Sequence, residues 1–123
     1  MITLTNRLSM VAGLIRDGHP LADIGTDHAY LPVFLLQEGR IPSAAACDVR
    51  EGPLRNAAAT VDTEEVADRV ELLLCSGFDH PRLPEYTDFS MAGMGGNLMV
   101  DLMTAAPFLK AEGIHLVLQP QSH

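Results

Sequence analysis

The sequence has little of several features that would mark other classes of protein. Its 123 residues include only 2 cysteines, which is too few for a scaffold held together by disulfides. No uninterrupted apolar run reaches about 18 residues, so no membrane-spanning helix is expected. Lysine and arginine total 8 against 16 acidic residues, a formal net charge of −8. This balance argues against a protein that coats nucleic acid nonspecifically.

The composition that remains is typical of a globular protein. Hydrophobic residues make up 47% and charged residues 20% of the chain, and this length predicts one domain with a real core. Cys47 and Cys75 each lie inside an apolar run and are predicted to be buried thiols, with no metal-ligand spacing between them. Residues 1–9 lack the apolar segment of a signal peptide. The chain is therefore expected to be cytoplasmic, without a metal.

Short apolar runs alternate with amphipathic stretches along the chain. Helical spacing, with glycine or proline at the ends, predicts helices over 8–15, 29–38, about 53–61 and 97–106. Apolar runs predict strands over 21–24, 43–49, 70–75, 88–92 and 114–118. This alternation predicts an α/β fold, with a parallel sheet of about five strands and helices on both faces.

Three local features add detail to this expectation. The run 70–75 is almost continuously apolar, as expected for a strand that is covered on both faces. Two prolines lie within 79–85, which is predicted to be a loop. Thr63 is expected to cap a short turn after the third helix.

Polar side chains come directly after the first predicted strand, and a ligand of such sheets sits outside the carboxyl ends of the strands. Residues 23–30 contain two carboxylates, an imidazole and a phenol. Gly25 allows a sharp turn and the close approach of a ligand. The alternative is that Asp23 and Asp27 only cap the next helix. A carboxylate at the end of a buried strand is costly unless something binds it, which favours a functional role.

An acidic residue also ends the second strand. Asp48 could accept both hydroxyls of a ribose, and its separation from Asp23 is close to the roughly 20 residues of a nucleoside-binding unit. The alternative is a solvated aspartate at a strand end. The first turn lacks G-x-G-x-x-G and carries Asp27, which would repel a pyrophosphate. A nicotinamide-dependent oxidoreductase is therefore disfavoured, and S-adenosylmethionine, a nucleoside with a positive charge, is favoured.

A glycine-rich stretch comes after the fourth strand. Three glycines within 93–96 predict a loop against which a flat base could lie, although a simple strand-to-helix turn is the alternative. The side-chain amides of Gln119 and Gln121, after the fifth strand, could read the edge of a base or contact a group of the cofactor. No N/D-P-P-Y/F string is present after the fourth strand, and this argues against methylation of an exocyclic adenine amine.

Several strings, in this order, resemble the bacterial tRNA (adenine(22)-N1)-methyltransferases, the TrmK family. They are L-A-D-I-G-T-D-H-A-Y-L-P (21–32), A-G-M-G-G (92–96) and L-Q-P (118–120), and R-L (7–8) and E-G-P (51–53) also agree. The resemblance covers nearly the whole chain. It implies a Rossmann-like class I methyltransferase domain over 1–123, S-adenosylmethionine as the cofactor and N1 of an adenine in tRNA as the methyl acceptor.

The resemblance also implies roles for individual residues. Those implied for catalysis are Asp27, His28, Tyr30, Gly93 and Met94. Those implied for cofactor binding are Asp23, Gly25, Thr26, Asp27, Asp48, Val49, Ser76, Gly77, Ala92 and Gly93. A carboxylate near the methylated ring would stabilise its positive charge. Asp27 is the candidate for this role, and backbone carbonyls of 93–95 are the alternative.

The chain departs from the family in two places. Cys75-Ser76-Gly77 stands where the family usually has Gly-Asp-Gly or Gly-Asn-Gly, so Ser76 replaces an acid or amide near the cofactor adenine, and compensation by Asp79 stays open. The family continues beyond Q-P with further strands and a helical domain. The fifth strand is therefore expected to be an exposed edge through which the chain could self-associate.

Two further expectations concern RNA. A noncatalytic module that binds a nucleoside, S-adenosylmethionine or RNA is the alternative to an enzyme, because the chain stops short of the family's full length. Arginines are the residues that would contact phosphates of tRNA. Four of them could form a local basic patch beside the mouth of the site, with ordinary solvated arginines as the alternative: Arg7, Arg16, Arg50 and Arg55.

Overall fold

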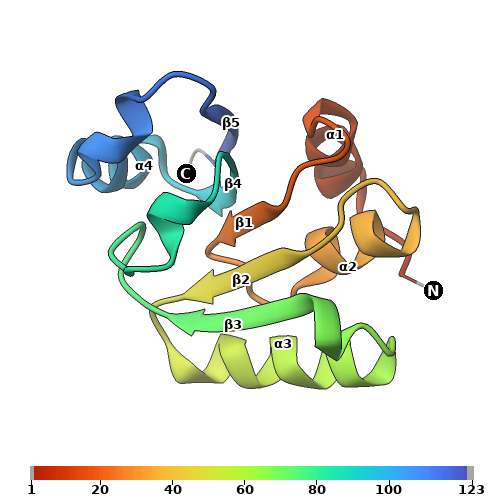
Figure 1. The fold of residues 1–123 in the computed structure, drawn as a ribbon. Coiled ribbons are helices and arrows are strands. Elements are labelled where there is room, and N and C mark those ends of the chain that lie inside the picture. The colour runs from red at the N-terminus through yellow and green to blue at the C-terminus, as the bar shows by residue number, and fades with distance from the viewer. Residues whose placement is uncertain (1, 122–123) are drawn as a thin grey trace.

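The computed structural model describes residues 2–121 and shows a single sheet with helices packed on it (Figure 1). The helices are α1 (Asn6–Leu14), α2 (Tyr30–Gln37), α3 (Glu51–Thr63) and α4 (Gly96–Thr104). The strands are β1 (Leu21–Ile24), β2 (Ala44–Asp48), β3 (Val70–Leu74), β4 (Asp88–Met94) and β5 (His115–Pro120). Short 3₁₀ turns occupy Ala67–Arg69, Leu83–Glu85 and Pro107–Lys110.

The five strands are parallel and lie in the order β3-β2-β1-β4-β5. Leu21 of β1 is in register with Ala44 on one side and Asp88 on the other. The chain moves outward from β1 to β3 and then returns to the centre at β4, so the strand order reverses between β1 and β4. The predicted five-stranded parallel sheet is confirmed, and a sheet of this kind binds ligands beside such a reversal.

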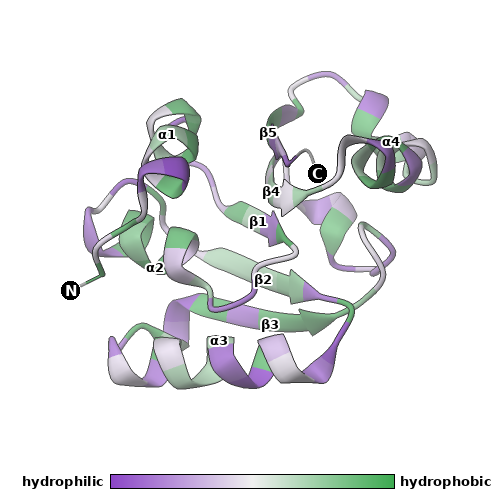
Figure 2. Cartoon of the chain, turned by 180° about the vertical axis from the view of Figure 1, so that it is seen from behind, coloured by the Kyte–Doolittle hydropathy of each residue, from purple (hydrophilic) through white to green (hydrophobic). Residues whose placement is uncertain are grey.

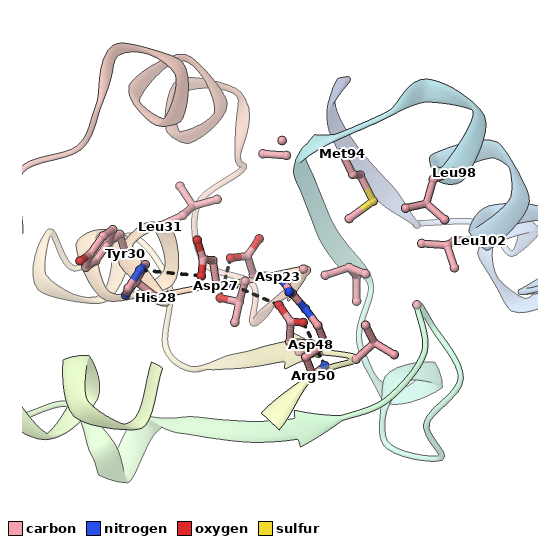
Figure 3. Close-up of a pocket in the computed structure, with 18 of the residues that line it drawn as sticks. Asp23, Asp27, His28, Tyr30, Leu31, Asp48, Arg50, Met94, Leu98 and Leu102 are labelled. Atoms are coloured by element: carbon pink, nitrogen blue, oxygen red, sulfur yellow. Dashed lines mark hydrogen bonds and ion pairs between the residues drawn. The ribbon is translucent and has the colours of Figure 1, made fainter. Parts of the chain in front are cut away.

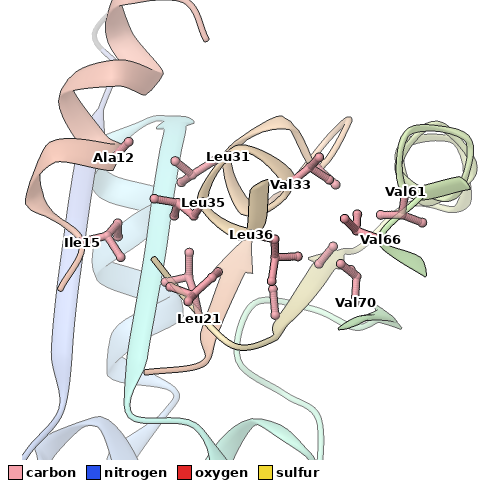
Figure 4. Packing of buried hydrophobic residues seen from close by; sticks show 14 of the residues in the cluster. Ala12, Ile15, Leu21, Leu31, Val33, Leu35, Leu36, Val61, Val66 and Val70 are labelled. Carbon is pink, nitrogen blue, oxygen red and sulfur yellow. The ribbon is translucent and has the colours of Figure 1, made fainter. Parts of the chain in front are cut away.

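Two apolar clusters cover the two faces of the sheet. The first joins α1, α2 and α3 to β1 and β2, with Leu21, Leu31 and Leu35 almost fully buried (Figure 4). The second packs α4 and the segment 78–83 on the other face, and its aromatic centre is formed by Phe78, Phe89 and Phe108. Helices therefore cover both faces, as predicted. Figure 2 shows the matching pattern, with mostly hydrophobic strands and with hydrophilic and hydrophobic residues mixed along α3.

Several of the expected boundaries are wrong in detail. β5 continues to Pro120 beyond its expected end at 118, and α4 ends at Thr104 before its expected end at 106. β4 continues through Gly93, which was expected to close it, because β5 pairs with β4 as far as Met94 across an irregularity in the register. Thr63 caps no turn, because it is the last residue of α3 and the N–H of Glu64 bonds back to the carbonyl of Thr60. The predicted loop 79–85 ends in a 3₁₀ turn at Leu83–Glu85.

The expectation that β3 is covered on both faces is also wrong. Val70 packs in the first cluster and Leu73 in the second, but Leu72 and Leu74 are 37% and 51% exposed. The reason is that β3 forms one edge of the sheet and has a neighbouring strand on one side only. β5 forms the other edge among the described residues, as expected.

Candidate functional site

A cavity of about 570 Å³ opens at the carboxyl ends of β1, β2, β3 and β4 (Figure 3). This volume is within the range of small-molecule sites in proteins. The sequence-predicted site residues all line it: Asp23, Gly25, Thr26, Asp27, His28, Tyr30, Asp48, Val49, Ser76, Gly77, Ala92, Gly93 and Met94. They come from four separate segments of the chain. The parallel sheet brings them together because it aligns the carboxyl ends of its strands.

Asp23 forms the buried inner wall of the cavity. Its two carboxylate oxygens accept hydrogen bonds from the hydroxyls of Thr26 (2.8 Å) and Ser90 (2.7 Å). Burial raises the pKa of Asp23 to about 6, although both hydroxyl bonds act in the opposite direction. The capping alternative is wrong for both aspartates, because α2 begins after Ala29 without a side-chain cap.

The loop after β1 is held in an unusual backbone conformation. Gly25, Asp27 and Ala29 all have positive φ angles, of 75°, 58° and 62°. Such angles cost energy for residues other than glycine and persist where the surroundings impose them. The N–H groups of Gly25 and Thr26 both donate to the carbonyl of Cys47, at 2.9 and 2.8 Å. These bonds attach the loop to the end of β2 and place Asp27 at the cavity mouth.

Asp48 is the last residue of β2 and is nearly buried. One carboxylate oxygen accepts the N–H of Arg50 at 3.2 Å, and the other accepts the N–H of Asp27 at a longer 3.4 Å. An ionised carboxylate has about four acceptor positions, so these two bonds orient the group without saturating it. The structure therefore presents Asp48 as an oriented acceptor on the cavity wall, beside Asp23 and Asp27 (Figure 3).

Three side chains of the loop and of α2 form one side of the mouth. The side chain of Asp27 is 68% exposed, and one of its oxygens lies 3.8 Å from Nε2 of His28. The His28 ring stacks on Tyr30, with centroids 4.9 Å apart and planes 8° apart. The mouth thus combines a solvated carboxylate with flat rings, which suits a flat ligand that gains positive charge.

The opposite side of the mouth is formed by the end of β4. Gly93 has a φ of 78°, and the guanidinium of Arg7 lies over it, about 3.5 Å from where a β-carbon would be. The N–H of Gly93 donates to Oε1 of Gln119 at 3.2 Å. Gln119 therefore supports this end of β4 and does not line the cavity, contrary to the expectation that it reads a base. Gln121 does line it. The loop predicted over 93–96 is instead a tight strand-to-helix turn, because β4 ends at Met94 and α4 begins at Gly96.

Of the two polar residues Ser76 and Asp79 after β3, only Ser76 reaches the cavity. Ser76 and Gly77 line it, whereas the exposed Asp79 does not. Asp79 instead donates its N–H to the carbonyl of Ser76. Compensation for Ser76 by Asp79 is therefore not supported by this arrangement.

The four arginines do not form one patch. Arg7 and Arg50 line the cavity. Arg16 lies at the opposite edge of the sheet, where it binds Asp88 at the start of β4 through two nitrogens, at 2.7 and 2.8 Å. Arg55 is exposed on α3, 3.7 Å from Glu51. The expected grouping is wrong for Arg16 because the chain leaves α1 toward the amino ends of the strands.

Sequence reasoning missed several lining residues. They are Thr5 and Leu8 near the start of the chain, Leu98 and Leu102 on α4, and Ile24, Leu31, Cys47 and Cys75 on the cavity walls. Apart from Thr5 they are apolar or thiol side chains, which look like ordinary core positions. The spacing of Leu98 and Leu102, one helical turn apart, is the one local signal that they share a face.

Residues 2–121 contain neither a candidate metal site nor a candidate membrane-spanning helix. No group of three or more histidine, cysteine or acidic side chains in this part of the chain is placed to hold a metal ion. No helix there is long and apolar enough to cross a membrane.

A parallel sheet in this order, with acidic residues and a cavity at its carboxyl edge, defines a Rossmann-like α/β fold. The family described as a methyltransferase domain matches residues 4–123, and the chain belongs to that family. The chain is 30% identical, over 122 residues, to the tRNA (adenine(22)-N(1))-methyltransferase of Bacillus subtilis (strain 168). That match covers 99% of this chain and 51% of the relative.

Solved structures of tRNA m1A22 methyltransferases, established or putative, also match this chain. The B. subtilis m1A22 tRNA methyltransferase TrmK matches with a TM-score of 0.91 and 30% identity, over 98% of this chain and 51% of that one. M. capricolum TrmK with S-adenosyl-homocysteine matches with a TM-score of 0.84 and 27% identity, over 97% of this chain and 53% of that one. Streptococcus pneumoniae Sp1610 with S-adenosyl-L-methionine matches with a TM-score of 0.87 and 32% identity, over 100% of this chain and 57% of that one. The resemblance to the TrmK family is confirmed, and the chain spans about half the length of these relatives.

Proposed function

We propose that residues 1–123 form the cofactor-binding and catalytic domain of a cytoplasmic, S-adenosylmethionine-dependent tRNA methyltransferase that acts on N1 of adenine 22. The observation that carries the proposal is the convergence of the predicted site residues, from four segments, on one cavity of about 570 Å³. The similarity to relatives solved with S-adenosyl-homocysteine and S-adenosyl-L-methionine supports the choice of cofactor.

The cavity fits a cationic nucleoside. Asp48 is oriented by two backbone N–H groups and keeps acceptor capacity for the two hydroxyls of a ribose. Ser76 and Gly77, on the wall beside it, would lie against the adenine of the cofactor. Gly25 has no β-carbon, so this part of the wall stays open; a β-carbon there would lie 2.7 Å from Cε of Met94. Asp23 and Asp27 add negative charge toward a sulfonium.

The bound cofactor would supply an activated methyl group, and the chain would supply position and charge. Adenine N1 has a lone pair in the ring plane, so no general base is needed. The exposed carboxylate of Asp27 would stabilise the positive charge that the ring gains. Carbonyls of residues 93–95, on the far side of the mouth, are the alternative. The stacked rings of His28 and Tyr30 offer a flat surface for an adenine turned out of its stack.

Two further parts of the proposal concern partners. Arg7 and Arg50, at the cavity, would contact tRNA phosphates, although the formal net charge of the whole chain is −8. The outer edge of β5 would allow the chain to self-associate by pairing of strands. Sedimentation across a range of protein concentrations tests the second part.

Cofactor binding is tested with Asp48→Asn. Loss of a charged acceptor for the ribose should weaken binding of S-adenosylmethionine about tenfold to a hundredfold in a calorimetric titration. The matched control is Asp62→Asn, which changes an exposed aspartate of α3 and should leave affinity unchanged. Equal affinities of the Asp48→Asn variant and the unaltered protein would remove the ribose assignment.

The reaction is tested with tRNA that is unmodified at adenine 22 and a labelled methyl donor. Methyl transfer to N1, located by mass spectrometry of nucleosides, is expected. Cofactor binding without transfer to any tRNA would instead support the noncatalytic alternative for this part of the chain.

A further inference from the structure

Two glutamines lie at the end of β5, and their side chains have different surroundings. Both ends of the Gln119 amide bind the protein: Oε1 accepts the N–H of Gly93 at 3.2 Å, and Nε2 donates to the carbonyl of Pro120 at 3.2 Å. Gln121 is exposed and lines the cavity. Its side-chain amide has no hydrogen-bond partner within residues 2–121. Gln121 therefore offers the cavity a free donor and a free acceptor.

The backbone fixes the position of Gln121. Its N–H donates to the carbonyl of Met94 at 2.9 Å, directly after the pairing of Met94 with Pro120 that ends the two strands. Pro120 also lies close to the start of α4, because its Cβ is 3.8 Å from where a β-carbon of Gly96 would be. Gln121 is thus held beside the end of β4, on the side of the mouth opposite the stacked rings of α2 and the loop before it.

The proposed cofactor ligands leave this end of the cavity for the methyl acceptor. Asp48 ends β2 and Ser76 follows β3, so the proposed ribose and adenine positions lie toward that edge of the sheet. The cavity continues on the other side of β1, where Met94, Leu98 and Gln121 line it. Met94 and Leu98 offer apolar contact, whereas the amide of Gln121 can form directional hydrogen bonds.

Methylation at N1 determines which edge of an adenine the protein can read. N1 must face the methyl donor, so the edge that carries N1 is committed to the reaction. The neighbouring edge presents N7 as an acceptor and the N6 amine as a donor. A glutamine amide has one acceptor oxygen and one donor nitrogen, and it pairs with N6 and N7 through two hydrogen bonds. Guanine has acceptors at both O6 and N7, so it cannot form this pair of bonds.

We propose that Gln121 is a specificity-determining residue for the methyl acceptor: its Oε1 accepts a hydrogen bond from the N6 amine of the target adenine, and its Nε2 donates to N7. The inference rests on the proposed function, because it requires the adenine that is methylated at N1 to enter this cavity. A base whose face lies on the rings of His28 and Tyr30 keeps its edges free to be read from the opposite side of the mouth.

The test compares two tRNAs, one with adenine and one with 7-deazaadenine as the target base. 7-Deazaadenine has a C–H group in place of N7 and keeps N1 and the N6 amine. With S-adenosylmethionine at saturation, kcat/KM of the unaltered chain should be about tenfold lower for the 7-deaza tRNA. Gln121→Ala should lower kcat/KM for the adenine tRNA about tenfold or more, and it should methylate both tRNAs equally well. A preference for N7 that persists in Gln121→Ala, or that is absent in the unaltered chain, would overturn the proposal.

The matched control is Gln37→Ala, which removes an amide outside the cavity, where Nε2 of Gln37 donates to Glu64 at 2.8 Å. This variant should keep the full preference for N7. Both variants should bind S-adenosyl-homocysteine as tightly as the unaltered chain in a calorimetric titration. Weaker binding by Gln121→Ala alone would place its amide on the cofactor and overturn its assignment to the base.

A second measurement requires no turnover. In the chain saturated with S-adenosyl-homocysteine, the side-chain amide signal of Gln121 in a ¹⁵N NMR spectrum is assigned by its loss in Gln121→Ala. This signal should shift when the adenine tRNA is added, and it should shift less with the 7-deaza tRNA. Such a shift without methyl transfer would support the contact and count against the proposed function. Methyl transfer without a shift would overturn the contact alone, and a chain that neither binds nor methylates the tRNA would overturn both.

Discussion

The hydroxyl of Ser90 donates a 2.7 Å hydrogen bond to Asp23, directly across the pairing of β4 with β1. Thr26 donates to the other oxygen of the same carboxylate at 2.8 Å. The groups that replace the water lost by Asp23 on folding are thus two neutral hydroxyls. Burial consequently raises the pKa of Asp23 to about 6. The carboxyl at the centre of the site therefore titrates close to neutral pH.

This pKa predicts how stability depends on pH. The folded pKa of Asp23 lies above its usual value of 3.8, so the folded state holds the proton more tightly. The contribution of Asp23 is fully present below pH 3.8 and is lost as the pH rises through about 6. Relative to Asp23→Asn, the free energy of unfolding should fall by about 2 kcal/mol between about pH 4.5 and about pH 7.

Urea unfolding of the two proteins at several pH values measures this difference. The asparagine variant does not titrate at this position, so it corrects for all other groups. A difference that stayed constant, or that grew with pH, would contradict the raised pKa of Asp23.

Asp88, at the other end of the sheet, should show the opposite dependence. Burial acts to raise its pKa, but hydrogen bonds from Arg16 and Thr87 outweigh this, so the pKa lies below its usual value. Asp88 therefore stabilises the fold at pH values above its unfolded pKa, and this contribution is lost in acid. Arg16→Met should raise the pKa of Asp88, measured by NMR titration, and lower the melting temperature most at neutral pH.

The control for this prediction is Arg69→Met, which changes an exposed arginine of the 3₁₀ turn before β3. Arg69→Met should leave the pKa of Asp88 and the melting temperature nearly unchanged. An unaltered pKa of Asp88 in the Arg16→Met variant would show that the bidentate pair does not control this carboxylate.

Two glycines should respond to alanine in opposite ways. Gly25 has a φ of 75°, and a β-carbon there would lie 2.7 Å from Cε of Met94, so Gly25→Ala should destabilise the fold by about 1–3 kcal/mol and weaken cofactor binding. Gly13 lies within α1 with open space around it. Gly13→Ala should stabilise the protein by about 0.5–1 kcal/mol. Thermal unfolding of both variants measures the contrast, and equal effects would contradict it.

Asp27→Asn tests the charge at the mouth. Asparagine tolerates the left-handed backbone that Asp27 adopts, so the loop should keep its shape. If the carboxylate stabilises the methylated ring, turnover should fall about tenfold or more, with little change in cofactor affinity. Asp79→Asn, outside the cavity, is the control. Loss of cofactor affinity with unchanged turnover at saturation would make Asp27 a binding residue.

Much of the fold could be predicted from local pattern. β1 coincides with its predicted limits, 21–24, and the five strands and four helices were all expected. Errors arose where a neighbour in space decides the outcome. β4 runs past Gly93 because β5 lies beside it, and β3 exposes Leu72 and Leu74 because it is an edge strand.

The sequence by itself determined which residues could gather at one edge of the sheet, since short-range spacing sets where each strand ends and which side chains come directly after it. Only the tertiary structure decided which of them touch. The pairing of Arg16 with Asp88, the position of Arg7 over Gly93 and the hydrogen bond from Ser90 to Asp23 join residues far apart in the chain. The order of the strands creates these contacts, and it depends on how the two apolar clusters pack as a whole.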